Sequence, residues 1–226
     1  KEVDLISRLE MVMRSMGHQG SLRFRRFNSI VPLGHVMSGP AAACPSFLAS
    51  PTGGKGTSLI FPQGAGYSRI KRNEPVFVDM VGIYNGYIAD ATRIFSLGRI
   101  EPELEEAYQA ACQIEEDLAR QMSAGKTGRE LFLLSEAAGA DLGYQDYLGG
   151  PPGGKCGFVG HGVGLELDEY PVIGPLDHEL QSNMTIAIEP KIIYPDKGVL
   201  GIEDTFLTSS GAAESLTHMP RDIWQV

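Results

Sequence analysis

The fold is decided by residues 76–93, which read Val76-Phe77-Val78-Asp79-Met80-Val81-Gly82-Ile83-Tyr84-Asn85-Gly86-Tyr87-Ile88-Ala89-Asp90-Ala91-Thr92-Arg93. An Asn-Gly pair between two runs of β-branched and aromatic residues is a strong signal for a β-hairpin with a two-residue turn. With the Asn-Gly pair as that turn, Val81 pairs with Asp90 and Asp79 pairs with Thr92. Cross-strand partners share a face of the sheet, as do residues two apart on one strand. Asp79 and Asp90 are therefore expected as diagonal neighbours on one face.

Two carboxylates this close repel each other, so either one of them holds a proton or a cation lies between them. A hydrophobic hairpin gains no stability from such a pair. Taken singly, Asp79 or Asp90 would be more typical of a turn or of the surface. Together on one face, they are interpreted as half of a metal site.

A second hairpin with the same property is predicted in the last third of the chain. Its strands are expected over residues 184–190 and 199–207, with a turn around Pro195-Asp196-Lys197-Gly198. A loop of three or five residues places Glu189 opposite Glu203 on one face, whereas a four-residue loop places them on opposite faces. Each half of the chain then presents two carboxylates, which predicts two related αββ halves that share a central site.

His161 adds an imidazole to these four carboxylates, within the run Gly160-His161-Gly162-Val163-Gly164. Four carboxylates and one histidine form a hard-to-borderline ligand set that suits Mn²⁺, Co²⁺, Fe²⁺ or Zn²⁺. Two divalent cations balance four carboxylate charges, which favours a two-metal site. Two ions ~3.5–4 Å apart can hold a hydroxide between them and polarise a carbonyl, which is the chemistry of metal-assisted hydrolysis.

Helices are predicted around the two hairpins. Apolar spacing indicates a helix over residues 2–17, and Pro102 with its acidic neighbours begins a helix that runs to about residue 122. Thr127 and Glu130 have the spacing of a capping box, which predicts a helix to about residue 142. Strand character is also indicated over residues 21–33 and 156–159, and residues 34–66 are predicted as a long loop.

The composition excludes several classes of function. The chain has 226 residues and a net charge of −9, without an extended run of Lys or Arg, which argues against nucleic-acid and anionic-membrane partners. No apolar run approaches the ~20 residues of a membrane span, and the N-terminus lacks a signal-peptide pattern. Cys44, Cys112 and Cys156 have the scattered spacing expected of reduced thiols in a cytoplasmic protein.

The ordered motifs resemble those of the pita-bread metallopeptidases, the family of aminopeptidase P, prolidase, methionine aminopeptidase and creatinase. The resemblance covers nearly the whole chain and is strongest to the aminopeptidase P and prolidase branch. It implies an α+β pita-bread fold with two pseudo-twofold-related αββ halves, a curved antiparallel sheet and helices outside. Residues 1–226 are expected to form a single catalytic domain, without the N-terminal domain that typical members of the branch carry. The motifs that carry the resemblance are Val78-Asp79, Gly86 to Arg93, Gly160 to Gly164, Ile188-Glu189-Pro190 and Gly201-Ile202-Glu203-Asp204.

The resemblance also implies a role for each ligand. Asp79 would chelate one ion, and Asp90 and Glu203 would bridge both ions. His161 and Glu189 would bind the other ion, with Glu189 moving the proton of the attacking water, so His161 and Glu189 are the catalytic candidates. The implied cofactor is two divalent ions, Mn²⁺ or Co²⁺ first and Zn²⁺ or Fe²⁺ next, and the implied substrate is a small peptide or peptide-like amide. By the same resemblance, a homodimer is an open expectation.

Two positions depart from the family pattern. Where the family usually has substrate-binding histidines, this chain has Ser46 and Asp168. Those histidines donate hydrogen bonds to the substrate carbonyl and the tetrahedral intermediate. A serine can replace a donor, but a carboxylate repels a developing oxyanion unless it is protonated or turned towards a cation. Ser46 and Asp168, together with Tyr87 and Arg93, are the candidate substrate-binding residues.

Three hypotheses about function remain. The first is a dinuclear metallohydrolase similar to Xaa-Pro aminopeptidases and dipeptidases. The second is a relative with a changed substrate, which hydrolyses a non-peptide amide or catalyses an elimination. The third is a non-catalytic metal-binding module. The presence of all five predicted ligands favours an enzyme, because a scaffold has no physical need of them.

Overall fold

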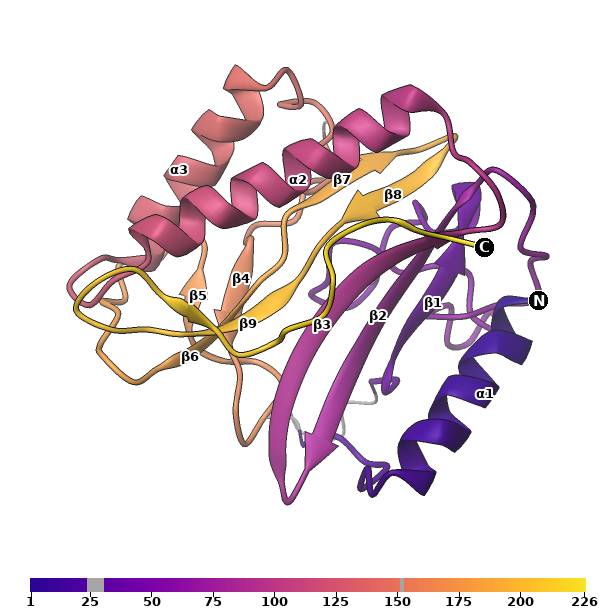
Figure 1. Ribbon diagram of the computed structural model, residues 1–226, viewed down its shortest axis with the longest axis horizontal. Helices are drawn as coiled ribbons and strands as arrows, with labels where there is room; N and C mark the ends of the chain where they lie inside the picture. Colours follow the sequence, from indigo (N-terminus) through magenta and orange to yellow (C-terminus); the bar gives the residue numbers. More distant parts are fainter. Residues whose placement is uncertain (24–30, 151–152) are drawn as a thin grey trace.

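The computed structural model describes residues 1–23, 31–150 and 153–226, and it confirms the predicted α+β class. Strands from both halves of the chain curve around a central region, and the helices lie outside them (Figure 1). None of the helices in the described ranges is long and apolar enough to cross a membrane. The helices are α1 (Glu2–Ser15), α2 (Pro102–Gln121) and α3 (Gly128–Asp141), with a short 3-10 turn η1 (Gly39–Ala41). The strands are β1 (Gly34–Ser38), β2 (Pro75–Tyr84), β3 (Tyr87–Ser96), β4 (Gly160–Gly162), β5 (Glu169–Ile173), β6 (Thr185–Ile188), β7 (Lys191–Tyr194), β8 (Gly198–Gly201), β9 (Asp204–Leu207), β10 (Glu214–Ser215) and β11 (Trp224–Gln225).

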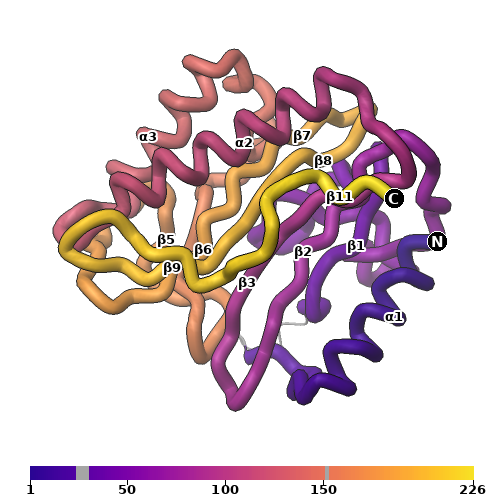
Figure 2. The backbone as a smooth tube through the Cα atoms, viewed as in Figure 1, coloured from indigo at the N-terminus to yellow at the C-terminus, as the bar shows by residue number. Residues whose placement is uncertain are grey.

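The strands form one sheet from each half of the chain and a two-stranded ribbon, β7-β8. The first sheet has the order β1-β2-β3-β11, and the second has the order β10-β9-β6-β4-β5. The C-terminal segment returns to the first half, where β11 runs parallel to β3 (Figure 2). The two sheets meet at Thr92 of β3 and Glu203, whose backbone amides donate to each other's carbonyl oxygens at 3.1 and 3.3 Å. Main-chain pairing therefore joins the halves at a predicted metal ligand.

The first hairpin has the predicted register. Val81 pairs with Asp90, and Asp79 pairs with Thr92. Asn85 and Gly86 both have positive φ, 51° and 82°, as the two-residue turn that matches the twist of the strands requires. The Asn-Gly turn thus sets which residues share a face, and it places the two aspartates on the same one.

The second hairpin has the odd loop length that aligns the two glutamates. Tyr194 pairs with Gly198, which leaves a loop of three residues, 195–197. The pairs Lys191 with Gly201 and Ile188 with Asp204 belong to one continuous register, so Glu189 faces Glu203. The predicted pairing of the two glutamates is confirmed.

The hydrophobic core lies behind this second hairpin. Helix α2 has a buried stripe at helical spacing, which includes Leu104, Ala107, Ala111 and Leu118, and it packs in the same cluster as isoleucines of β6 and β7. Alternate residues of a strand point to opposite faces. With Ile186 and Ile188 of β6 turned towards α2, Glu189 is left to face the opposite side, where the first hairpin lies.

Several predicted boundaries were wrong. The strand expected at 184–190 ends at Ile188, because Pro190 has no amide hydrogen to continue a ladder, and the strand expected at 199–207 is divided into β8 and β9. Residues 156–159 do not form a strand, since the ladder begins at β4, where a neighbouring strand lies on each side. The expected loop at 34–66 contains β1, which is stabilised by pairing with β2. Residues 21–23 and 31–33 are not in a strand, and the rest of that prediction lies outside the described residues.

We expect Gly86→Ala to lower the free energy of unfolding by about 1 kcal/mol, because an L-residue at this positive φ is strained. A Cβ on Gly86 would meet nothing within 4 Å, so the backbone alone accounts for the cost. Gly157→Ala is the matched control, since Gly157 is equally open but has no positive φ. Urea denaturation monitored by circular dichroism measures both variants. Equal losses in the two would contradict the importance of the turn geometry.

Candidate metal centre

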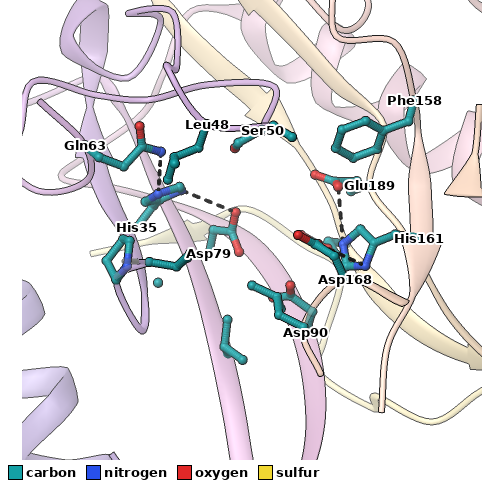
Figure 3. A pocket seen from close by; sticks show the side chains of 17 residues that line it. His35, Leu48, Ser50, Gln63, Asp79, Asp90, Phe158, His161, Asp168 and Glu189 are labelled. Carbon is teal, nitrogen blue, oxygen red and sulfur yellow. Dashed lines mark hydrogen bonds and ion pairs between the residues drawn. The ribbon is translucent and has the colours of Figure 1, made fainter. Parts of the chain in front are cut away.

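All five predicted metal ligands line one pocket between the two hairpins. Asp79 lies on β2 and Asp90 on β3, so one wall comes from the first hairpin. His161 lies on β4, and the two glutamates come from the second hairpin. Figure 3 shows Asp79 on one side of the space and His161 and Glu189 on the other, with Asp90 below and between them. The ligands that line the pocket are Asp79, Asp90, His161, Glu189 and Glu203.

Three of these side chains could hold one divalent ion together. Asp90, His161 and Glu203 each offer a ligand atom, and these atoms lie within 4.8 Å of one another. All three residues are buried. Two carboxylates and an imidazole are a donor set that Mn²⁺, Co²⁺ and Zn²⁺ accept. The residues present therefore fit a divalent cation at this position.

The surroundings of His161 select which ring nitrogen faces the ion position. Its Nδ1 lies 3.0 Å from the carbonyl oxygen of Gly162, which accepts a hydrogen bond from an Nδ1–H. Asp168 Oδ1 lies 3.7 Å from the same nitrogen, and Glu189 Oε1 lies 3.6 Å from Nε2. A proton held on Nδ1 leaves the Nε2 lone pair for a metal ion, and carbonyl or carboxylate partners commonly orient a histidine ligand in this way.

The carboxylates are strongly perturbed by burial and by each other. Burial, reinforced by the charge of Asp79, raises the pKa of Asp90 to about 8. Burial and then Asp90 raise the pKa of Glu203 well above its ordinary value. Burial lowers the pKa of His161, but the charges of Glu189, Asp168 and Asp90 outweigh it, and the net pKa lies above the ordinary value. The carboxylates still outnumber the positive charges around them, and a bound cation would supply further positive charge.

Lys191 is the residue that the sequence analysis missed. Its side chain is buried, and Nζ lies 2.5 Å from Glu189 Oε2, 3.1 Å from Glu203 Oε2 and 3.3 Å from Asp79 Oδ2. Burial lowers the pKa of Lys191, but these three carboxylates outweigh it and hold the pKa well above its ordinary value. Strand alternation was the available signal, because a residue two positions after Glu189 shares its face.

A chain of side chains leads from Ser46 to Asp79. Ser46 Oγ donates to Gln63 Oε1 at 2.9 Å, Gln63 Nε2 lies 3.0 Å from His35 Nε2, and His35 Nδ1 lies 3.8 Å from Asp79 Oδ2. Burial lowers the pKa of His35 despite the charge of Asp79. A neutral His35 that accepts from Gln63 carries its proton on Nδ1, towards Asp79. Ser46 itself does not line the pocket, but it orients this chain.

The other candidate substrate residues lie in different places. Asp168 lines the pocket beside His161. Tyr87 is 69% exposed at the end of the hairpin, and Arg93 is buried. The Arg93 guanidinium donates to the carbonyl oxygen of Glu203 at 2.9 Å and to Asp204 Oδ1 at 2.7 Å. The structure therefore brings Asp168 to the pocket but not Tyr87 or Arg93, and Arg93 supports the backbone that carries Glu203.

The apparent affinity for Mn²⁺ is expected to rise with pH up to about pH 8. Asp90, with a pKa of about 8, holds a proton in the metal-free protein at neutral pH, and an ion has to displace that proton. Below this pKa, the dissociation constant should fall about tenfold for each pH unit per proton released. Calorimetric titration at pH 6 to 9, in buffers of different ionisation enthalpy, measures both the affinity and the protons released.

Asp90→Asn is the control for this pH dependence, because an amide cannot release a proton and binds cations weakly. We expect this variant to bind Mn²⁺ poorly at every pH. An affinity for Mn²⁺ that does not change between pH 6 and 8 in the unaltered chain would contradict the assignment of Asp90 as a ligand.

Comparison with known proteins identifies relatives over most of the chain. A family model described as metallopeptidase family M24 matches residues 1–210. The Xaa-Pro dipeptidase of Pyrococcus furiosus is 32% identical over 170 residues, which are 74% of this chain and 47% of that protein. The uncharacterized peptidase YqhT of Bacillus subtilis is 27% identical over 223 residues, which are 98% of this chain and 54% of that protein. The chain spans about half the length of the curated relatives it matches.

Solved structures show the same architecture. The X-Pro aminopeptidase from Thermotoga maritima MSB8 superposes with a TM-score of 0.82 at 26% identity, covering 100% of this chain and 55% of that one. The prolidase from Pyrococcus horikoshii OT3 gives a TM-score of 0.78 at 26% identity, covering 99% and 55%. The pita-bread fold and the family resemblance expected from the sequence are confirmed.

Proposed function

We propose that this chain, which belongs to metallopeptidase family M24, is the metal-dependent catalytic part of a hydrolase that cleaves Xaa-Pro peptide bonds. The observation that carries the proposal is the convergence of four carboxylates and His161 on one pocket between the two hairpins. The similarity to an Xaa-Pro dipeptidase supports the choice of peptide substrates. The cofactor is proposed as divalent metal, with Mn²⁺ or Co²⁺ as first candidates.

Asp90, His161 and Glu203 would hold the ion. A bound divalent ion supplies a Lewis acid and makes water nucleophilic at neutral pH. Glu189, which lies in the pocket wall with Oε1 towards His161, would receive the proton from the attacking water and pass it to the leaving amine. Because Asp90, Glu189 and Glu203 are buried, water screens their charges weakly, which strengthens each electrostatic interaction between them. A second ion would need Asp79, whose Oδ2 is already close to Lys191.

Asp168 favours a second candidate, a relative with a changed substrate. A carboxylate at the pocket wall repels the oxyanion that forms during amide hydrolysis. The Asp168 carboxylate also attracts a cationic group. It would therefore favour binding of a substrate with a positive charge near its scissile bond and disfavour the hydrolysis of an ordinary peptide.

The test of the proposed function is a panel of Xaa-Pro dipeptides and longer Xaa-Pro peptides, assayed with Mn²⁺ or Co²⁺. We expect release of the N-terminal residue, and we expect Asp90→Asn and Glu203→Gln to lose both metal and turnover. Measuring the metal content of each sample by mass spectrometry separates loss of metal from loss of chemistry. A metal-loaded chain without turnover of any peptide in the panel would favour the changed substrate.

Asp168→His should raise the turnover of Xaa-Pro peptides about tenfold or more. The histidine restores a hydrogen-bond donor at the pocket wall, and one such donor typically contributes ~10²–10³ in rate. Asp168→Asn is the matched control, since it removes the charge but keeps the size of the side chain. Steady-state kinetics at equal metal content compares the three proteins. A lower rate in both variants would mean that the Asp168 carboxylate has a role of its own.

A further inference from the structure

Lys191 contacts three of the four carboxylates in the cluster. Its Nζ contacts one oxygen from each of three predicted ligands, Asp79, Glu189 and Glu203, at distances of 2.5 to 3.3 Å. These oxygens come from both hairpins, so the ammonium links the two walls of the pocket. Three donors of one ammonium group match three acceptor oxygens, which is the full hydrogen-bonding capacity of a lysine.

The fold is shaped to admit this side chain. Lys191 on β7 pairs with Gly201 on β8, and a Cβ at position 201 would lie 2.6 Å from Lys191 Cγ. Glycine at 201 therefore leaves the space through which the lysine stem passes. The ammonium also lies 5.3 Å from the centre of the Phe77 ring, within the range of a cation–π contact. The lysine is held along its length and not only at its charged end.

The contacts of Lys191 divide the cluster into two parts. Glu189 turns Oε2 to Lys191 and Oε1 towards His161. Glu203 Oε2 accepts from both Lys191 Nζ and Thr92 Oγ1, the latter at 2.9 Å. Asp79 Oδ2 lies 3.3 Å from Lys191 Nζ and 3.8 Å from His35 Nδ1, so both partners face the same oxygen. The ligand atoms of Asp90, His161 and Glu203 remain grouped on the other side.

We propose that the Lys191 ammonium permanently takes the position of the Asp79-side divalent ion, so that the chain binds one ion, at Asp90, His161 and Glu203. This inference rests on the proposed function, in which the pocket binds divalent metal, and it sets the number of ions. An ion coordinated by the oxygens of Asp79, Glu189 and Glu203 would compete with the ammonium for the same space, and two cations so close repel each other.

The fixed ammonium has different chemistry from the ion it replaces. It offers positive charge and hydrogen-bond donors, but it has no exchangeable coordination positions at which water or substrate could bind. Asp79 consequently serves as a partner of Lys191 and His35 instead of a metal ligand. Lys191 also neutralises part of the carboxylate charge in the absence of metal, which stabilises the empty pocket.

Metal stoichiometry and electron paramagnetic resonance with Mn²⁺ test the inference without reference to activity. We expect the unaltered chain to bind about one Mn²⁺ with the six-line spectrum of an isolated ion. Lys191→Met keeps an unbranched side chain of similar length but removes the charge and the donors. This variant should bind about two Mn²⁺ and show the broadened spectrum of two coupled ions. Lys197→Met is the matched control, because Lys197 pairs with Glu101 and Glu103 away from the pocket, and it should bind about one ion.

A second variant keeps the inference testable if Lys191→Met does not fold. Asp79→Asn should leave about one Mn²⁺ bound, because Asp79 does not hold the ion, whereas Asp90→Asn should lose it. Two coupled ions in the unaltered chain would overturn the inference and leave the proposed function standing. One ion in Lys191→Met would also overturn it, since the lysine would then not be what excludes the second ion. Absence of bound ions from every variant and from the unaltered chain would overturn the proposed function itself.

Discussion

The mutual repulsion of four neighbouring carboxylates, three of them buried, is the constraint on which the rest of this structure depends. Asp79 and Asp90 face Glu189 and Glu203 across one pocket, and Asp90, Glu189 and Glu203 are buried, so water screens their charges weakly. Such a cluster persists only with positive charge or with protons inside it. The raised pKa of Asp90 and the ammonium of Lys191 show both responses within one site.

The backbone around the pocket is arranged to keep these charges in place. Thr92 and Glu203 exchange main-chain hydrogen bonds, and Thr205 Oγ1 accepts from the amide of Asp90 and donates to its carbonyl oxygen, both at 3.0 Å. Arg93 binds the carbonyl oxygen of Glu203 and the carboxylate of Asp204. The carboxylates are thus attached to a rigid frame formed by both halves of the chain, and neither hairpin could move without breaking buried polar contacts. Breaking a buried polar contact costs more free energy than breaking one at the surface, because the separated groups cannot form hydrogen bonds with water instead.

Two side-chain systems, one on each wall, adjust the chemistry of the pocket. Ser46, Gln63 and His35 form a neutral chain that ends at Asp79, while Asp168 lies beside the nitrogen of His161 that faces away from the ion position. Each system includes one of the two residues, Ser46 and Asp168, that the sequence predicts to depart from the family pattern. Ser46 does not line the pocket and is connected to Asp79 only through Gln63 and His35, whereas Asp168 lines the pocket directly.

The sequence by itself determined the parts that depend on local geometry. An Asn-Gly turn specifies a two-residue hairpin, and strand alternation then places Asp79 and Asp90 on one face. The sequence left the pairing of Glu189 with Glu203 open, because it depends on the loop length, and the three-residue loop of the structure decides it. Only the tertiary structure decided what stands between these faces. Lys191 and His35 are ordinary residues in the sequence. His35 enters the site because β1 pairs with β2 and puts it opposite Asp79, and Lys191 enters it because the glycine at position 201 leaves space for its stem. Strand alternation could place Lys191 on the face of Glu189, but the contact of Lys191 with Asp79 joins residues far apart in the chain, so no local pattern records that contact.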